Sequence, residues 1–282
     1  MLIGVFLYIM MKWTGGYMLP ELFSIGPVTI YSYGLMIAIG VLAAIGLGEH
    51  LAKKTGLAED GFMTSLGVYS VIGGFLGAKI LYWITILPEL IRDPSHFLDL
   101  ANGFVVYGGL IGGILTAWIY CRWKKTDFLK AFDLAAPLIA LAQGFGRIGC
   151  FLAGCCYGEE THSVFGVVFH NSPYAPSDVR LIPTQLISSG LDFLNFLFLY
   201  LLFRRQSRKD TAEQKKGTVG CMYIITYSVG RFILEFFRGD LERGAVGVLS
   251  TSQFISVFTV IAGIVLFVVC NRKKTASGEV ED

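Results

Sequence analysis

The stretch that decides the fold is residues 135–158, which read AAPLIALAQGFGRIGCFLAGCCYG and contain one charged residue, Arg147. A run of this length is long enough to cross about 30 Å of hydrocarbon as a helix. An arginine at the centre of such a helix costs roughly 2.5–3.5 kcal/mol on insertion scales, so it needs a partner, a water-filled cavity or an anionic ligand. A second apolar run, residues 221–237, carries Arg231 and is followed by Arg238. Two segments that bring cations to one apolar interior indicate a site for an anionic, greasy molecule such as a phospholipid.

The composition places the whole chain in a membrane. Apolar residues make up 54% of the 282 residues and charged residues only 16%, and the mean hydropathy is +0.62. Soluble domains carry about 25% charged residues. The 34 glycines agree with this class, because small residues let helices approach closely within a bilayer. We therefore expect an all-α, polytopic membrane protein.

Apolar blocks of about 20 residues predict seven transmembrane helices. They cover residues 28–48, 62–87, 104–121, 131–151, 186–203, 218–237 and 254–270. Residues 1–11 are apolar but too short to span, so we expect them at the membrane interface. The spans are expected to form one domain over residues 1–282. A basic cytoplasmic loop is expected at about 204–217, and a short cytoplasmic tail at about 271–282.

Lysine and arginine gather in alternate loops. The loops after the first, third and fifth predicted spans, and the tail, hold most of the lysines and arginines, whereas the other loops hold few. With seven spans these basic segments fall on one side, which the positive-inside rule assigns to the cytoplasm. The N-terminus is therefore expected outside and the C-terminus in the cytoplasm. Basic loops can also bind nucleic acid, but charges that flank apolar spans are typical of membrane topology, so no nucleic-acid partner is expected.

Glycines surround Arg147, with Gly146 and Gly149 beside it and Gly154 further on. Such glycines permit a broken helix, whose exposed backbone N–H groups could meet an anion. The guanidinium itself could hold a phosphate by a bidentate contact. The alternative is that Arg147 pairs with a carboxylate between helices or extends to the membrane surface.

Arg231, Glu235 and Arg238 form a second group of charges. Spacings of four and three residues predict that they share one helix face. Glu235 could then fix the geometry of one or both arginines, so that they present hydrogen-bond donors to a ligand. The alternative is an ion triad that only ties helices together.

Two tyrosines lie beside glycines in predicted spans. Tyr107 precedes Gly108 and Gly109, which leave room beside the ring, so its phenol could donate a hydrogen bond or relay a proton. Tyr33 precedes a glycine in the first predicted span. Taken alone, Tyr107 is favoured as an interfacial aromatic anchor, and Tyr33 indicates an aromatic belt at the membrane interface.

Cys150, Cys155 and Cys156 cluster at the outer end of the fourth predicted span, and His162 and His170 follow. Cysteine and histidine clusters can bind metal, but C-x4-C-C is not a usual zinc spacing. An oxidising compartment would permit a disulfide, and a covalent thiol intermediate is a further alternative. The favoured interpretation is small residues at a tight helix crossing.

Six sequence elements occur in the order that one enzyme family shares, along nearly the whole chain. They are YGLM at 33–36, GGLIG at 108–112, GRIG at 146–149 with Gly154 and Gly158, PTQL at 183–186, the group of Arg231, Glu235 and Arg238, and Gln253. In these elements the chain resembles prolipoprotein diacylglyceryl transferases, bacterial membrane enzymes that begin lipoprotein maturation.

The resemblance implies a reaction and its partners. The diacylglyceryl group of phosphatidylglycerol would move to the thiol of a lipobox cysteine in a prolipoprotein signal peptide, and glycerol phosphate would leave. The enzyme would be a multi-pass protein of the bacterial cytoplasmic membrane, surrounded by membrane lipids. No metal or organic cofactor is expected.

The resemblance also implies functional residues. The implied catalytic residues are Arg147, Arg231 and Tyr107. The implied substrate-binding residues are Arg147, Arg238, Glu235, Tyr33, Gly108, Gly109, Gly149, Gly154 and Gln185.

Three polar positions depart from the family pattern. Tyr107 stands where the family usually has histidine, Cys150 where it has asparagine and Cys155 where it has glutamate. The arginines are kept, so the phosphate-holding half of the site is intact while the proton-handling half is altered. A phenol with a pKa near 10 is a poor base at neutral pH. Tyr107 therefore fits better as a hydrogen-bond donor, with thiolate formation left to the arginine charges.

Other classes of function remain open at this point. A lipid-binding or lipid-translocating protein could use the same arginines without chemistry, although the chain has no evident internal repeat of the kind that many transporters carry. A non-catalytic scaffold with a structural charge triad is a second possibility, and a related transferase with another acceptor is a third.

Overall fold

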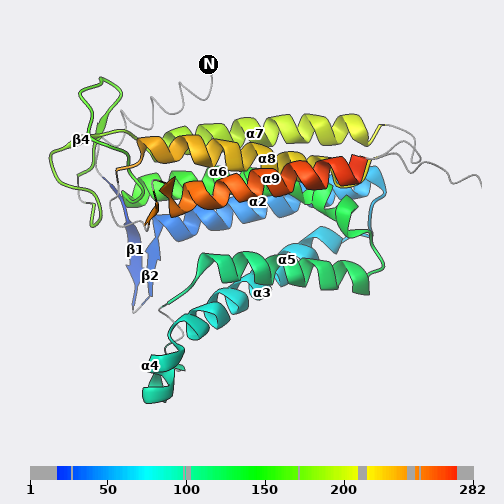
Figure 1. The fold of residues 1–282 in the computed structure, drawn as a ribbon, viewed down its shortest axis with the longest axis horizontal. Helices are drawn as coiled ribbons and strands as arrows, with labels where there is room; N and C mark the ends of the chain where they lie inside the picture. The colour runs from blue at the N-terminus through cyan, green and yellow to red at the C-terminus, as the bar shows by residue number, and fades with distance from the viewer. Residues whose placement is uncertain are drawn as a thin grey trace, which may run out of the picture. The chain divides into compact units, whose positions relative to one another are not determined.

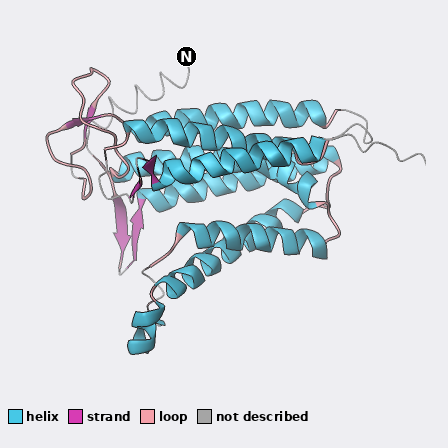
Figure 2. Cartoon of the chain, in the orientation of Figure 1, coloured by secondary structure: helices cyan, strands magenta, loops and turns pink. Residues whose placement is uncertain are grey.

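The computed structural model describes residues 18–26, 28–97, 99, 103–170, 172–208, 215–239, 245–247 and 249–271. Within these ranges the chain is mostly helical, with three small two-stranded antiparallel sheets (Figure 2). The interfacial segment predicted at residues 1–11, nearly all of the predicted tail and the middle of the predicted basic loop lie outside the described residues.

The long helices follow one another along most of the chain (Figure 1). They are α2 (Ser32–Thr55), α3 (Phe62–Thr85), α5 (Val106–Trp123), α6 (Phe128–Ala153), α7 (Thr184–Gln206), α8 (Thr218–Leu234) and α9 (Thr251–Asn271). The short helices are α4 (Leu87–Arg92) and the 3-10 helices η1 (Pro94–Phe97) and η2 (Glu235–Phe237). The strands pair as β1 (Glu21–Ile25) with β2 (Val28–Tyr31), β3 (Val167–Val168) with β4 (Arg180–Leu181), and β5 (Ala245–Val246) with β6 (Leu249–Ser250).

A helix forms at each of the seven predicted spans. Within the described ranges, six helices are long and apolar enough to cross a membrane, which confirms a polytopic α-helical membrane protein. The exception is α5, whose 18 residues include Arg122 and Trp123 at its end. Both residues lower the hydropathy of α5, so a seventh span stays a prediction, as does the side of each terminus.

The start of the first predicted span is wrong by four residues. Residues 28–31 form β2 and pair with β1, and the helix begins only at Ser32. Val28, Thr29 and Ile30 are β-branched, a residue type that favours strands over helices. The hydropathy of this segment is the same in either structure, so hydropathy did not distinguish them.

Large apolar side chains cover the outside of the long helices. On α9 alone, Phe258, Ile261, Val265 and Val269 are each more than half exposed. Soluble proteins rarely show continuous apolar surface of this extent. Such a surface is stable in lipid, where apolar side chains meet apolar chains.

The chain divides into two compact units, each described by itself. The first unit comprises Met1–Ala44 and Asp133–Asp282, and the second comprises Ile45–Phe132. In the first unit α6, α7, α8 and α9 run side by side (Figure 1). Polar pairs join them: the Ser189 hydroxyl donates to the carbonyl of Gly144 at 2.9 Å, and the Tyr223 phenol donates to Gln143 Oε1 at 3.0 Å.

Glycines bring α3 and α5 into backbone contact within the second unit. A Cβ atom added at Gly77 would lie 2.3 Å from the carbonyl oxygen of Gly108, and one at Gly112 would lie 2.3 Å from that of Gly73. Real Cβ atoms do not approach so closely, so these positions require glycine. Close backbone approach is how helices associate in lipid, where the hydrophobic effect does not drive them together.

Replacing Gly77 by alanine is therefore expected to destabilise the protein by about 1–3 kcal/mol, the usual cost of overpacking. The matched control is Gly46→Ala on α2, where an added Cβ would meet nothing within 4 Å and alanine is the better helix former. Thermal unfolding of the detergent-purified protein measures the difference. Equal melting temperatures for the two variants would contradict the close packing.

A small apolar core anchors the long loop between α6 and α7. Its buried members include Phe151 at the end of α6, Phe169 and Leu181 in the loop, and Leu186 at the start of α7. The rings of Phe151 and Phe169 meet edge to face, with centroids 5.8 Å apart. This core fixes the loop that carries Cys155 and Cys156.

Candidate functional site

A polar cleft lies in the first unit at the ends of α6, α7 and α8. It is open to solvent on one side, and its empty volume of about 260 Å³ includes the solvent space at its mouth. The residues that line it are Arg147, Cys156, Thr184, Gln185, Ser188, Arg231, Leu234 and Arg238. The cleft thus gathers three arginines from the two charged stretches of chain that the sequence singles out.

Helix α6 delivers Arg147 to the cleft without a break. The glycines would permit a break in the helix, but α6 continues through Gly146 and Gly149 to Ala153. Gly149 serves packing instead: an added Cβ would lie 3.1 Å from Met36 Cβ and 3.2 Å from Tyr33 Cα of α2. The close contact with α2 offsets the cost of glycine in a helix interior. The backbone of α6 is hydrogen-bonded within the helix, so the side chain of Arg147 is the donor that faces an anion.

Arg147 has its donors available. It is half-buried, and within the described part of the chain it makes no hydrogen bond and no ion pair. Asp192 of α7 and Tyr227 of α8 act on it electrostatically from a longer distance. The carboxylate-paired alternative is therefore not what the described residues form. A guanidinium held this way can bind an incoming phosphate by two parallel hydrogen bonds.

Arg231 is fixed by two contacts. Its Nη1 atom lies 2.6 Å from Glu235 Oε2, and its Nη2 atom donates to the Ser252 hydroxyl of α9 at 2.9 Å. Glu235 thus pairs with Arg231, as both the ligand-binding and the ion-triad interpretations require, and the presentation of donors to a ligand stays a prediction. Because Glu235 is buried, the pair is screened little by solvent and keeps a defined geometry.

Arg238 lines the cleft but lies beyond the end of helix α8. The prediction of one helix face for all three charges is wrong: α8 ends at Leu234, and Arg238 is extended with φ −89° and ψ 134°. The cause is pairing with the loop after α6. The N–H of Glu159 donates to the Phe237 carbonyl at 3.0 Å, and the N–H of Gly239 donates to the Tyr157 carbonyl at 3.3 Å.

Gln185 and Thr184, at the start of α7, hold the loop after α6 in place. The Gln185 amide donates to the carbonyl of Cys155, and the Thr184 hydroxyl donates to the carbonyl of Cys156, both at 2.8 Å. Gln185 is almost fully buried, and its Oε1 atom has no hydrogen-bond partner within the described ranges. A buried acceptor of this kind is available to a hydroxyl group in the cleft.

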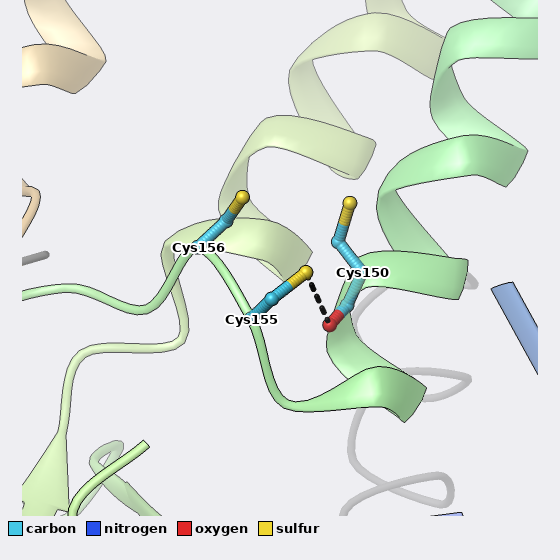
Figure 3. A group of neighbouring side chains, drawn as sticks. All are labelled: Cys150, Cys155 and Cys156. Carbon is cyan, nitrogen blue, oxygen red and sulfur yellow. Dashed lines mark hydrogen bonds between the residues drawn. The ribbon is translucent and has the colours of Figure 1, made fainter. Parts of the chain in front are cut away.

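Three thiols meet beside the cleft. The sulfur atoms of Cys150, Cys155 and Cys156 all lie within 4.8 Å of one another (Figure 3). All three are free thiols. Only Cys150 belongs to a helix, because α6 ends at Ala153. The interpretation as small residues at a helix crossing is therefore wrong for Cys155 and Cys156.

Hydrogen bonds within the group shift the pKa values of Cys155 and Cys156 in opposite directions. Hydrogen bonds with Cys150 and then with Cys155 hold the pKa of Cys156 below its usual range, and the Arg238 guanidinium, which also bonds this sulfur, acts in the same direction. Hydrogen bonding with Cys150 and then with Cys156 raises the pKa of Cys155.

The remaining residues implied by the resemblance fall into two sets. Tyr33 of α2 lies within electrostatic reach of Arg147. Gly154 has φ +75° and would place a Cβ 2.4 Å from the Ser172 hydroxyl, so it serves the turn that ends α6. Tyr107, Gly108 and Gly109 belong to the second unit, and none of them is among the residues that line the cleft. Their role in the reaction stays a prediction.

A polar stripe runs along α7, and of its members only Gln185 was predicted from the sequence as a site residue. Thr184, Gln185, Ser188, Ser189 and Asp192 repeat at spacings of three and four within an otherwise apolar helix. Such spacing puts them on one face. Asp192, a buried carboxylate in a membrane helix, was the available signal, because an ionisable residue there marks a functional interior.

The fold and the cleft together define a polytopic membrane protein with an arginine-lined cleft. Residues 20–269 match the protein family described as prolipoprotein diacylglyceryl transferase. The chain belongs to this family, which confirms the resemblance.

Curated relatives agree over most of their length. The chain is 50% identical to phosphatidylglycerol–prolipoprotein diacylglyceryl transferase of Clostridium tetani, with 89% of this chain and 97% of the relative covered. It is 47% identical to phosphatidylglycerol–prolipoprotein diacylglyceryl transferase 2 of Clostridium perfringens, with 88% and 93% covered. A relative of the same name from Prochlorococcus marinus is 33% identical, with 87% and 88% covered.

Proposed function

We propose that this protein transfers the diacylglyceryl group of phosphatidylglycerol to the lipobox cysteine of prolipoproteins, in the bacterial cytoplasmic membrane. One observation carries the proposal: Arg147, an arginine within a membrane helix, has no ion pair in the described part of the chain and shares a cleft with Arg231 and Arg238. The names of the relatives support the same substrates.

In this reaction the carbon–oxygen bond between the glyceryl group and the phosphate breaks. Negative charge gathers on the departing glycerol phosphate. Arg147 would bind two phosphate oxygens, and Arg231, held by Glu235, would approach from α8. Preorganised donors at the place where charge develops are worth several kcal/mol of barrier, about 3–4 kcal/mol for one donor. Because the helices exclude water, the charge–charge attraction is stronger than in solution.

The acceptor thiol must ionise before it attacks carbon. Arg238, which enters the cleft from the segment after η2, adds positive charge on the side where Cys156 lies. Nearby cations favour the thiolate. The nucleophile is the thiol of the prolipoprotein, and the phenol of Tyr107 would act as a hydrogen-bond donor.

The test is transfer by the purified full chain. The protein is reconstituted in vesicles that contain phosphatidylglycerol, and a peptide with a lipobox cysteine is added. We expect the peptide to gain the mass of a diacylglyceryl group, and to gain none in vesicles of phosphatidylethanolamine alone. Binding of phosphatidylglycerol without any mass gain would overturn the proposal and favour a lipid-binding protein.

A further inference from the structure

We propose that Cys150, Cys155 and Cys156 bind a single Zn²⁺ ion, whose fourth coordination position is reached from the arginine cleft. The three sulfur atoms lie within 4.8 Å of one another. In a tetrahedral zinc site, Zn–S bonds of about 2.3 Å place the sulfur atoms about 3.8 Å apart. Shifts of about 1 Å or less in side chains would thus bring the thiols to ligand geometry. Thiolates are ligands that Zn²⁺ prefers.

The backbone holds the thiols together in a defined conformation. Gly154 and Cys156 both have left-handed φ angles, of 75° and 63°. This conformation is uncommon for a residue with a side chain, and such residues cluster at functional sites. Hydrogen bonds from Gln185 and Thr184 then fix the carbonyls of Cys155 and Cys156 at 2.8 Å. Hydrogen bonds from α7 therefore fix the turn that contains Cys155 and Cys156.

The number of ligands points to a reactive site. Within the described ranges the group contains three metal-binding side chains. Structural zinc sites use four protein ligands, whereas catalytic ones use three and leave one position for water or substrate. Cys156 lines the cleft, so a molecule in the cleft can reach an ion bound to Cys156.

The charges around the group suit such a complex. Three thiolates and one divalent cation sum to one negative charge. Arg238 hydrogen-bonds the Cys156 sulfur, and Arg147 acts electrostatically on Cys150 and Cys156. A buried anionic complex needs cationic partners of this kind. The same arginines remain close to a phosphate in the cleft.

The chemistry of the ion rests on the proposed function. The acceptor thiol would bind Zn²⁺ as a thiolate and release its proton to solvent. The thiolate sulfur then forms a bond to the glyceryl carbon, and the electron pair of the breaking carbon–oxygen bond leaves with glycerol phosphate. The ion keeps its charge, and nothing is oxidised or reduced. Zn²⁺ would thereby favour formation of the acceptor thiolate. The phenol of Tyr107 could not do this as a base, because a phenol is a poor base at neutral pH.

The test measures metal content separately from activity. The full chain is purified in detergent without chelator, equilibrated with Zn²⁺ and desalted, and zinc is measured by mass spectrometry. We expect roughly one ion per chain in the parent, and a loss of at least about tenfold in Cys150→Ser and Cys156→Ser, which each remove one of three ligands. The matched control, Cys270→Ser, alters a free cysteine on α9 outside the group and should keep the ion.

A second measurement uses only the parent chain, so its result does not depend on whether the variants fold. The parent is loaded with Co²⁺, and a thiolate-to-metal absorption band is expected that excess Zn²⁺ removes. A parent chain that retains no zinc and shows no such band, or that contains a disulfide within the group, overturns the proposal. Transfer by a metal-free parent would overturn the proposed role of zinc in the reaction and leave the proposed function standing. A parent that binds the ion but transfers no diacylglyceryl group would overturn the proposed function and leave the zinc site standing.

Discussion

Arg147→Ala is expected to lower the rate of diacylglyceryl transfer by about 10²–10³-fold, the usual effect of removing one donor that stabilises developing charge. The protein should stay folded, because Arg147 makes no hydrogen bond or ion pair within the described part of the chain that the variant would break. Arg147→Lys keeps the charge but loses the planar two-point contact with phosphate. We therefore expect an intermediate loss for lysine.

The measurement is the rate of mass gain by a lipobox peptide, together with the melting temperature of each variant. Arg205→Ala is the matched control, since Arg205 lies exposed in the last turn of α7, and its rate should equal that of the parent. An inactive Arg147→Ala protein that also melts far below the parent would indicate a structural role for Arg147. Full activity in that variant would remove Arg147 from the mechanism.

The sequence was sufficient to find the arginines because a charge in an apolar block conflicts with its surroundings. Arg147 and Arg231 were chosen on this ground, and both line the cleft. The pairing of Arg231 with Glu235 was also predictable, because residues four apart on a helix are neighbours. The helices themselves followed from hydropathy, which depends on local composition alone.

Features that depend on distant parts of the chain were not predictable. The position of Arg238 depends on backbone pairing with Gly158, 80 residues earlier in the chain. The meeting of the three thiols depends on a turn that Thr184 and Gln185 hold from another helix. Spacing along the sequence contains neither contact, so the helix-face rule failed for Arg238.

The structural role of an individual glycine was also not predictable from the sequence. The sequence shows that a position tolerates glycine, but not whether the reason is a turn, a break or a close neighbour. Gly149 lies within α6 and lets α2 approach, whereas Gly154 has a left-handed backbone and lies in the turn that ends α6. The sequence does not distinguish the two, because both positions read only as glycine.

Asp133→Ala is expected to destabilise the protein by about 2–4 kcal/mol, because two buried N–H groups would each lose their acceptor. Asp133 of α6 is buried, and its two carboxylate oxygens accept from the N–H groups of Gly217 at 2.6 Å and Gly220 at 2.8 Å. Gly217 is the N-cap of α8 and has no side chain to cap it. Asp133 therefore caps α8 from a neighbouring helix, and its charge also favours the positive end of the α8 dipole.

The loss should appear as a fall of about 4–16 °C in melting temperature, since 1 kcal/mol shifts a protein of this size by roughly 2–4 °C. Asp133→Asn should recover only part of it, because an amide has one acceptor oxygen and carries no charge. Asp60→Ala is the control: it removes an exposed carboxylate that lies 3.3 Å from Lys53, a kind of pair worth at most about 1 kcal/mol. If Asp133→Ala and Asp60→Ala melt together, the start of α8 is held by other contacts. If only Asp133→Ala melts early and also transfers lipid slowly, the cap of α8 is what keeps Arg231 positioned in the cleft.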